Sequence, residues 1–597
     1  MPPVSNPFVD YLRRYTTASP DHEAAFDEFL AQTHPPTGEP LRLTTRVEQF
    51  LHERFAQPDP PSVILTGNAG DGKTYLCRQI LTAFGAEPDW DALADRPIER
   101  NGLRLHVVKD LSELGDTHGV ATLAGLAVSL DSDAPDRYLI AANEGRLRHL
   151  LSQDPRLAAL YQRVDEQLQG GPKAEGARLI VINLTEVTTS SFVPVTLQWM
   201  TAKQQWSACQ PCEIFARCPV RHNAVRLSDP LIVGRVQLLY QLLEHLDIHV
   251  TVRDMLIHLA YTLTADQQCA ELQRRVSSHR PLQKLAYYAN IWGGDEQSAF
   301  RRKASVAQHL GRLQVGAHSL FEIDDFIVSG GEAEEAGTRA EHERLFAPAV
   351  DLDERRFGQD REAYLQGGAE RSAADEARLL LEWLPHCRRK LFFEWHDAAR
   401  VSQLVAFRHL DDYLRLLNDE RGPLDLMRRN LVLGLNRAFS QLYLTDTNTL
   451  YVTTQYLHST EQPRPLVRLT LPTSGISLRL VRRAEDVFDR AWPDMQLVFA
   501  PPSSLLLREP DSAPRPVTWR LNLLLFEYLM RLAHGGTFNV LSDECGLGVR
   551  ELKDQLLSAF TYEPADHEQI EFFVAERRRY VLKQLRIDEQ NIIRSGG

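Results

Sequence analysis

Residues 67–74 read Gly67-Asn68-Ala69-Gly70-Asp71-Gly72-Lys73-Thr74 and match the phosphate-loop pattern G-x-x-x-x-G-K-[S/T]. The apolar run of residues 62–66 leads into this stretch and predicts a strand, and residues 75–81 continue it with helical spacing. A strand, a glycine-rich loop and a helix in this order are the context in which the pattern is meaningful. The stretch therefore predicts an α/β fold whose first strand carries a phosphate-binding loop.

The residue types of this loop indicate how a nucleoside triphosphate would be bound. Glycines let the backbone turn its N–H groups toward phosphate oxygens, and the helix that starts near Lys73 adds the positive end of its dipole. We expect Lys73 to reach the β and γ phosphates and Thr74 to ligate Mg²⁺. The other expected phosphate-binding residues are Gly67, Asn68, Ala69, Gly70, Asp71 and Gly72.

Composition and charge limit the class of protein. The chain has 597 residues, of which 43% are hydrophobic and 25% charged, as in a soluble globular protein of several domains. It has no apolar run long enough to span a membrane and no signal-peptide pattern at its start, so we expect a cytoplasmic protein. Because the net charge is −13, contact with DNA would require a local basic face, for which residues 577–579 are a candidate.

Three further apolar segments alternate with helical patterns downstream of the loop. This alternation predicts a parallel, doubly wound sheet. The segments are residues 103–108, 137–142 and 178–184.

Counting these strands gives a first catalytic assignment. In P-loop ATPases of the additional-strand type, the third strand ends in the magnesium-ordering acid and the catalytic glutamate, and the fourth ends in a polar sensor of the γ phosphate. Glu144 would then be the general base and Asn183 the sensor. Asn143 stands where the acid is expected, and its neutral amide would hold the magnesium water shell less firmly. Slow hydrolysis is the expected consequence.

A second assignment takes the strand at 103–108 as the acidic one. Asp110 would then bind magnesium, Glu113 would be the base and Asn143 the sensor. The chain order favours the first assignment, because the roughly 35 residues between Lys73 and Asp110 leave room for one helix but not for an intervening strand. Asp110 and Glu113 also fit a simple helix cap.

A helical lid is predicted after the strands. Thr251 and Asp254 form a capping-box pattern before the apolar helical run of residues 255–261. Arg253, in the first turn, lies where lid arginines of AAA+ ATPases touch the γ phosphate; the alternative is a surface arginine paired with Asp254 or Glu244. An arginine supplied across a ring interface could be any one of five: Arg146, Arg148, Arg221, Arg226 and Arg235.

A cluster of cysteines precedes the lid. Cys209, Cys212, Cys218 and His222 form a C-x2-C-x5-C-x3-H series that suits one structural zinc ion, with an iron–sulfur cluster or no metal as alternatives. His222 is the candidate fourth ligand, although another residue could replace it. The remaining cysteines are expected to be buried apolar side chains; these are Cys77, Cys269, Cys387 and Cys545.

The sequence divides into five expected parts. Residues 1–57 form a helical segment, 58–235 the nucleotide-binding core with the cysteine series at 209–222, and 236–330 the helical lid. Residues 331–374 are expected to form an exposed connection, and residues 375–597 are expected to form a mixed α+β interaction region. A helix-turn-helix within 520–560, with its turn at Gly546, is a further expectation.

Taken together, the loop at 67–74, the strand that continues as Asn143-Glu144-Gly145-Arg146-Leu147, the cysteine series with Pro219, and the lid start at 251–254 resemble bacterial anti-phage defence ATPases of the AAA+ or STAND-like kind. Among these ATPases, the sequence resembles the DptF-type ATPases of DNA phosphorothioation-dependent restriction. The resemblance covers residues 55–330. It implies ATP as the nucleotide and a subunit of a multi-protein complex that acts against foreign DNA, with cleavage by a partner. The alternative is a weakly hydrolysing, nucleotide-gated scaffold that recruits partner proteins.

Overall fold

A computed structural model describes most of the chain and divides it into two compact units. The first contains residues 1–244 and 248–405, and the second contains residues 245–247, 406–484 and 491–597. The structure describes residues 5–15, 34–85, 97–132, 134–169, 177–278, 280, 282–294, 298–347, 349–353, 356–367, 372–418, 424–454, 466–482, 492–502, 514–537, 543–560, 569–577, 579–588 and 591–595.

The first unit contains a five-stranded, mostly parallel sheet. Its strands lie in the order β2-β3-β4-β1-β5, and β3, β4, β1 and β5 are parallel. β2 pairs with β3 in the antiparallel direction. The four strands predicted from the sequence are confirmed, and β2 is an addition. The bounds are β1 Ser62–Thr66, β2 Ile98–Arg100, β3 Leu103–Val108, β4 Asp136–Ala142 and β5 Leu179–Asn183.

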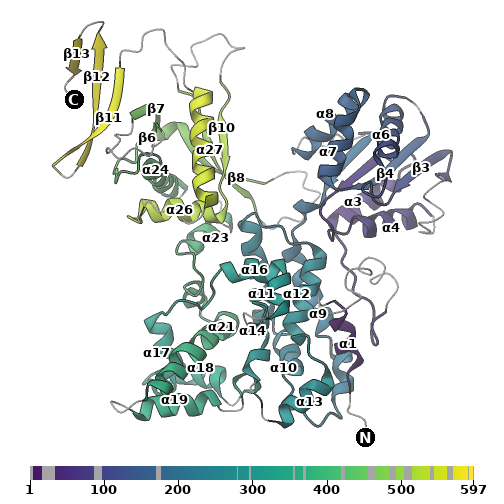
Figure 1. The fold of residues 1–597 in the computed structure, drawn as a ribbon, viewed down its shortest axis with the longest axis vertical. Helices are drawn as coiled ribbons and strands as arrows, with labels where there is room; N and C mark the ends of the chain where they lie inside the picture. The colour runs from purple at the N-terminus through teal and green to yellow at the C-terminus, as the bar shows by residue number, and fades with distance from the viewer. Residues whose placement is uncertain are drawn as a thin grey trace. The chain divides into compact units, whose positions relative to one another are not determined.

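Helices cover both faces of this sheet (Figure 1). Alternate residues of each strand point to opposite faces, so Val63 and Leu65 of β1 pack in one apolar cluster while Ile64 packs in the other. The first cluster joins the sheet to α3 Arg46–Phe55 and α4 Lys73–Ala83, and the second joins it to α6 Asp116–Leu130, α7 Glu144–Gln153 and α8 Ala158–Leu168. The result is a three-layer α/β/α core, as a doubly wound sheet requires.

The rest of the first unit is helical. α12 Val252–Thr264 begins at the predicted cap, where Asp254 N donates to Thr251 Oγ1 at 3.1 Å. The other helices of this part are α1 Pro7–Arg13, α9 Val193–Met200, α10 Pro219–Arg226, α11 Pro230–His245, α13 Cys269–Ser277, α14 Tyr287–Asn290, α15 Ala299–Lys303, α16 Ser305–Arg312, α17 Phe321–Ser329, α18 Ala336–Phe346, α19 Arg356–Gly367, α20 Ala373–Ala377, α21 Leu384–Glu394 and α22 Ala398–Ser402.

The second unit is built from two antiparallel sheets and four helices among its described residues. One sheet has the order β13-β12-β11-β7-β6, and the other has the order β10-β9-β8. The helices are α23 Leu410–Asn418, α24 Leu424–Ser440, α26 Leu523–Ala533 and α27 Asp543–Phe560. The strands are β6 Thr449–Thr453, β7 Leu466–Pro472, β8 Ile476–Val481, β9 Asp494–Phe499, β10 Val517–Arg520, β11 Gln569–Glu576, β12 Arg579–Asp588 and β13 Asn591–Ser595.

The domain plan differs from the sequence expectation in three places. Residues 336–367 of the expected exposed connection form α18 and α19, whose Leu345 and Phe357 are buried, because few but well-spaced apolar residues suffice to anchor a helix. The units therefore separate at Val405 and Ala406 rather than near residue 375. Position 235, the expected end of the nucleotide-binding core, lies inside α11.

The expected turn at Gly546 is wrong. α27 runs continuously from Asp543 to Phe560, and Gly546 is not among the glycines with positive φ in the described chain. A glycine inside a helix costs only about 1 kcal/mol relative to alanine, which the buried face of an 18-residue helix offsets. Part of the segment between α26 and α27, residues 538–542, lies outside the described residues, so a helix-turn-helix with its turn there stays a prediction.

No helix in the described part of the chain combines the length and the apolar composition needed to cross a membrane.

Candidate functional site

The glycine-rich loop connects the end of β1 to the start of α4. Three of its glycines have positive φ, at +150° for Gly67, +99° for Gly70 and +86° for Gly72. L-residues with a side chain rarely adopt these conformations. A Cβ atom at Gly67 would also lie 2.9 Å from Asp71 Oδ2. The glycines of the sequence pattern are therefore required by the backbone path of this loop.

The Lys73 ammonium lies across this loop. Lys73 Nζ donates to the carbonyl oxygens of Gly67 and Asn68, at 2.8 Å each. α4 begins at Lys73 after the left-handed Gly72, and the first amides of a helix have no partner within the helix. A cation, a helix N-terminus and a turned backbone thus converge at one point, which is an arrangement that attracts an anion.

A second element of the unit, the start of α12, holds the loop in place. Arg253 N donates to Gly70 O at 3.3 Å, and His249 Nε2 lies 2.7 Å from Asp71 Oδ1. A Cβ at Gly70 would lie 2.9 Å from the Cβ of Arg253 and 3.0 Å from Thr251 Oγ1. The backbone amide of Arg253 thus contacts the loop.

Glu244, one of the two partners considered for Arg253, binds Ser190. Its carboxylate accepts hydrogen bonds from the backbone N–H and the hydroxyl of Ser190, at 2.8 Å each.

Two asparagines flank the end of β1. β4 and β5 are the neighbours of β1, and Asn143 follows β4 while Asn183 ends β5. Asn143 caps α7 by accepting from Gly145 N at 3.0 Å. Asn183 accepts from both the backbone N–H and the hydroxyl of Thr185, at 3.1 and 2.8 Å. Both predicted polar residues therefore lie at the correct edge of the sheet, with their amide oxygens used by local caps.

Glu144 is part of an ion-pair network. It is the first residue of α7, and its Oε1 accepts from Arg148 Nε at 2.9 Å. Arg148 also donates to Asp165 at 2.5 Å, and its hydrogen bonds to these two carboxylates, that to Asp165 first, raise the pKa of Arg148. A general base at Glu144 would have to compete with this arginine for its carboxylate.

Asp110 follows β3 and lies next to β4. Its Oδ1 accepts from Ser112 N at 2.8 Å, and Leu111 N donates to Ala141 O at 2.8 Å, which fixes the turn beside the end of β4. Glu113 is exposed and lies 3.9 Å from Lys109 Nζ.

The chain-order argument against the Asp110 assignment is wrong. β2 does intervene between α4 and β3. It was missed because a three-residue antiparallel strand is too short to show an apolar periodicity.

Most of the candidate arginines bind groups of their own chain. Arg146 donates to Asp116 at 2.6 Å and to Leu114 O at 2.7 Å, and Arg226 lies 2.7 Å from Glu394. The Arg221 guanidinium lies 3.6 Å from the ring centre of Phe215. Burial lowers the pKa of Arg235.

The cysteine series lines a small cavity in the helical part of the unit. Cys209, Cys212 and Cys218 face it, and a fourth thiol joins them from the first residue of α13, Cys269. No local pattern indicated this residue, because it lies more than 50 positions from the series. Cys269 was expected to be an ordinary buried apolar side chain.

His222 is not among the residues that line the cavity. Its Nε2 lies 3.6 Å from Asp351 Oδ1, beside a buried network in which Lys390 binds both Asp351 and Glu394. Burial lowers the pKa of His222. The structure therefore does not bring the expected fourth ligand to the thiols.

The four cysteines are half-buried. Burial raises the pKa of Cys218 to about 12 and also raises the pKa of Cys209 and of Cys269. Such thiols are poor nucleophiles at neutral pH. Among the described residues, no group of three or more His, Cys, Asp or Glu side chains is arranged as it would be around a bound metal ion.

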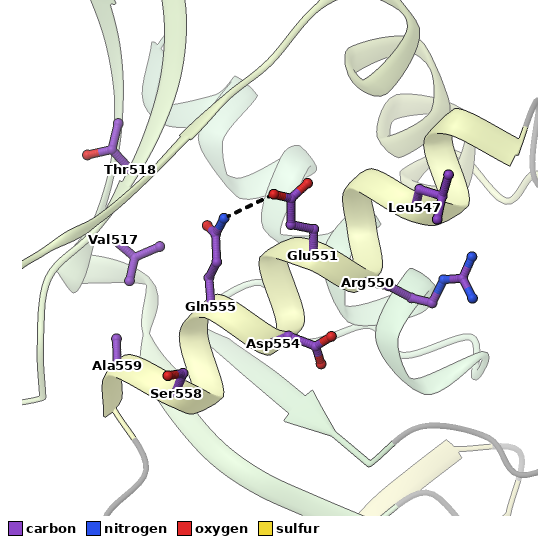
Figure 2. A pocket seen from close by; sticks show the side chains of 9 residues that line it. All are labelled: Val517, Thr518, Leu547, Arg550, Glu551, Asp554, Gln555, Ser558 and Ala559. Carbon is purple, nitrogen blue, oxygen red and sulfur yellow. Dashed lines mark hydrogen bonds between the residues drawn. The ribbon is translucent and has the colours of Figure 1, made fainter. Parts of the chain in front are cut away.

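A separate groove lies in the second unit between β10 and α27 (Figure 2). Its volume is about 960 Å³, and Val517 and Thr518 lie across from the side chains of α27. Two carboxylates, Glu551 and Asp554, and one guanidinium, Arg550, line it. This balance gives no positive excess for a phosphate, so the groove is not a second candidate for the nucleotide.

Comparisons with protein-family models, curated proteins and solved structures found no match for this chain.

Proposed function

We propose that this chain is a P-loop ATPase that binds ATP and Mg²⁺ at the loop of residues 67–74. The observation that carries the proposal is the position of Lys73, whose ammonium spans the loop at the N-terminus of α4. The carboxyl edge of a parallel sheet is where ligands bind in open α/β folds. Lys73 would neutralise the β and γ phosphates, and Thr74, the next residue of α4, would ligate magnesium.

The strand order supports the second catalytic assignment. The additional-strand class takes its name from a strand inserted between the phosphate-loop strand and the acidic strand. β4 lies between β1 and β3, so in this order β3 would be the acidic strand. Asp110 would then hold the magnesium water shell, with Asn143 as the sensor and Glu113 as the candidate base. The assignment of Glu144 as base and Asn183 as sensor is the alternative.

The lid contact supports coupling between nucleotide and conformation. α12 touches the loop through Arg253 N and the face of Gly70, so a change in the loop is transmitted to the helices behind it. When nucleotide binds, Arg253 would turn its side chain to the γ phosphate. The backbone contact of Arg253 with the loop would keep its guanidinium within reach of the γ phosphate.

The biological role we propose rests on the resemblance to DptF-type ATPases. The chain would be the ATPase subunit of a bacterial multi-protein restriction or anti-phage system, coupling nucleotide state to partner assembly or to DNA engagement. DNA would be contacted directly or through partners. The antiparallel second unit is the candidate partner-binding region.

One observation favours a second candidate, a weakly hydrolysing, nucleotide-gated scaffold. Glu144 is held by Arg148 and the Asn143 side chain caps α7, so neither is free to order water or magnesium in this conformation. A chain in this state would bind ATP and change its assembly without rapid turnover.

The test is ATP turnover by the purified full-length protein, with and without double-stranded DNA. Wild type is compared with Lys73→Ala, Asp110→Asn and Glu144→Gln, and exposed Lys203→Ala is the matched control. Loss of turnover in Lys73→Ala but not Lys203→Ala supports an ATPase, and stimulation by DNA supports the restriction role. If wild type binds ATP and turns it over no faster than Lys73→Ala, the scaffold replaces it.

A further inference from the structure

Four thiols from two distant parts of the chain converge on one cavity that the nucleotide site does not use. Cys209, Cys212 and Cys218 come from a single irregular segment, and Cys269 opens α13. Between them the wall is apolar, with Ile214 and Leu272 both buried. Chance burial of single cysteines is common, but four thiols facing one space in a chain with seven cysteines form a set of soft ligands.

N–H groups are directed at the sulfur atoms of this cavity. Asn6 donates to two of them, with its backbone N 3.4 Å from Cys269 Sγ and its Nδ2 3.2 Å from Cys209 Sγ. Gln273 Nε2 lies 3.5 Å from Cys212 Sγ. Three of the four sulfurs, those of Cys209, Cys212 and Cys269, thus receive N–H donors, which is the outer-shell pattern that stabilises metal-bound thiolates.

The size of the cavity limits what it can hold. It leaves about 20 Å³ for a water-sized occupant. A single water needs about 10–15 Å³ measured in this way, so the space fits one atom and not a cluster of several iron and sulfide atoms. Four soft donors around one atom match the tetrahedral coordination of zinc.

We propose that Cys209, Cys212, Cys218 and Cys269 bind one zinc ion as a four-thiolate structural site. On binding, each thiol loses its proton to solvent, and the ion draws the four sulfurs together from the positions they have around the cavity. With four protein ligands no coordination position stays open, so the site stabilises structure and does not activate water. The ion would tie residues 209–218 to α13 and, through Asn6, to the start of α1. His222 is excluded because it faces Asp351.

Wild-type protein alone can decide the ligand set. The full-length chain is purified under reducing conditions, analysed for zinc and iron, and its zinc examined by X-ray absorption. The expected result is about one zinc per chain with four sulfur neighbours at about 2.3 Å. A nitrogen neighbour at about 2.0–2.1 Å overturns the four-thiolate assignment. Iron with acid-labile sulfide overturns it as well, as does a chain that holds no zinc after reconstitution.

Variants then locate the ligands. Cys269→Ser should release its zinc to a chelator that leaves the wild type loaded, whereas His222→Gln and the matched buried-cysteine control Cys545→Ser should keep it. Asn6→Ala should weaken zinc binding by about 10- to 100-fold, as loss of an outer-shell partner does. Retention of zinc by Cys269→Ser, or its loss from His222→Gln alone, overturns the proposal. If Cys269→Ser fails to fold, the absorption spectrum of the wild type still decides the question.

Discussion

The glycine-rich loop and the cysteine cavity are built in contrasting ways. The loop takes its chemical groups from eight consecutive residues, and the distant element, α12, only supports them. In the cavity the consecutive segment supplies three thiols, and the distant element supplies the fourth. A contiguous motif can therefore contain a complete candidate phosphate site, but it indicates the proposed metal site only as far as the motif extends.

Both sites also depend on the same helix. The start of α12 touches Gly70, and its end precedes Cys269 by five residues. α1, which follows Asn6, packs on α12. The two sites could therefore share α12 as a scaffold and still bind their ligands independently.

The largest expected effect tests this independence. Lys73→Ala should lower ATP turnover by about 10²- to 10³-fold, because it removes the cation that faces the transferring phosphate. Its zinc content should equal that of the wild type. Cys269→Ser should show the converse, with zinc lost and ATP still bound at 25 °C. The measurements are steady-state turnover, nucleotide binding and metal analysis on the same preparations. Loss of zinc in Lys73→Ala would show that the two sites are one coupled system.

The same contrast between contiguous and distant residues explains which parts of the structure could be predicted from the sequence. The strands at 62–66, 103–108, 136–142 and 179–183 were predictable because each is a largely apolar run between helical patterns. The cap at Thr251 was predictable from a local pattern that acts within four residues.

Other features depend on tertiary contacts that no local pattern encodes. Cys269 joins the thiols, and His222 turns to Asp351, only through the packing of the helices. β2 has three residues and exists through its pairing with β3. Gly546 looked like a turn because glycine often ends helices, and the buried side of α27 overrode that preference.

Two glycines of the loop give a matched pair for testing its support by α12. Both have positive φ, but a Cβ at Gly70 meets Arg253 and Thr251, whereas one at Gly72 meets nothing within 4 Å. Gly72→Ala should cost about 1–3 kcal/mol of unfolding free energy from backbone strain alone. Gly70→Ala should cost about 1–3 kcal/mol more, as overpacking does. Denaturant unfolding without nucleotide measures both, and equal losses would contradict a tight contact between the loop and α12.

Because both sites depend on α12, we expect the unfolding free energy of the unit that contains them to depend on pH. His258 of α12 lies between Tyr240 Oη at 2.6 Å and Ile291 O at 2.7 Å, and burial lowers its pKa to about 4. The unfolded chain binds this proton near pH 6.5, so stability is full above that value and falls as the pH drops toward 4, by about 3 kcal/mol.

Replacement of this histidine isolates its share of the pH dependence. His258→Gln cannot titrate, so its unfolding free energy should change less than that of the wild type between pH 6.5 and 4. Urea unfolding across this range measures the difference. Identical slopes for the two proteins would assign the acid sensitivity to other groups.

The smallest expected effect concerns the cap that positions α12 under the loop. Thr251→Ala removes the oxygen that accepts from Asp254 N and should lower the unfolding free energy by about 1 kcal/mol, while Thr251→Ser keeps the oxygen and should lose less. Because Thr251 also faces Gly70, the alanine variant should weaken ATP binding more than zinc binding. Thermal unfolding and the two binding assays measure this ratio. An equal loss of ATP and zinc affinity would mean that α12 supports the loop and the cavity as one body. The two sites would then differ in how the sequence encodes their ligand-binding residues and not in how the fold supports those residues.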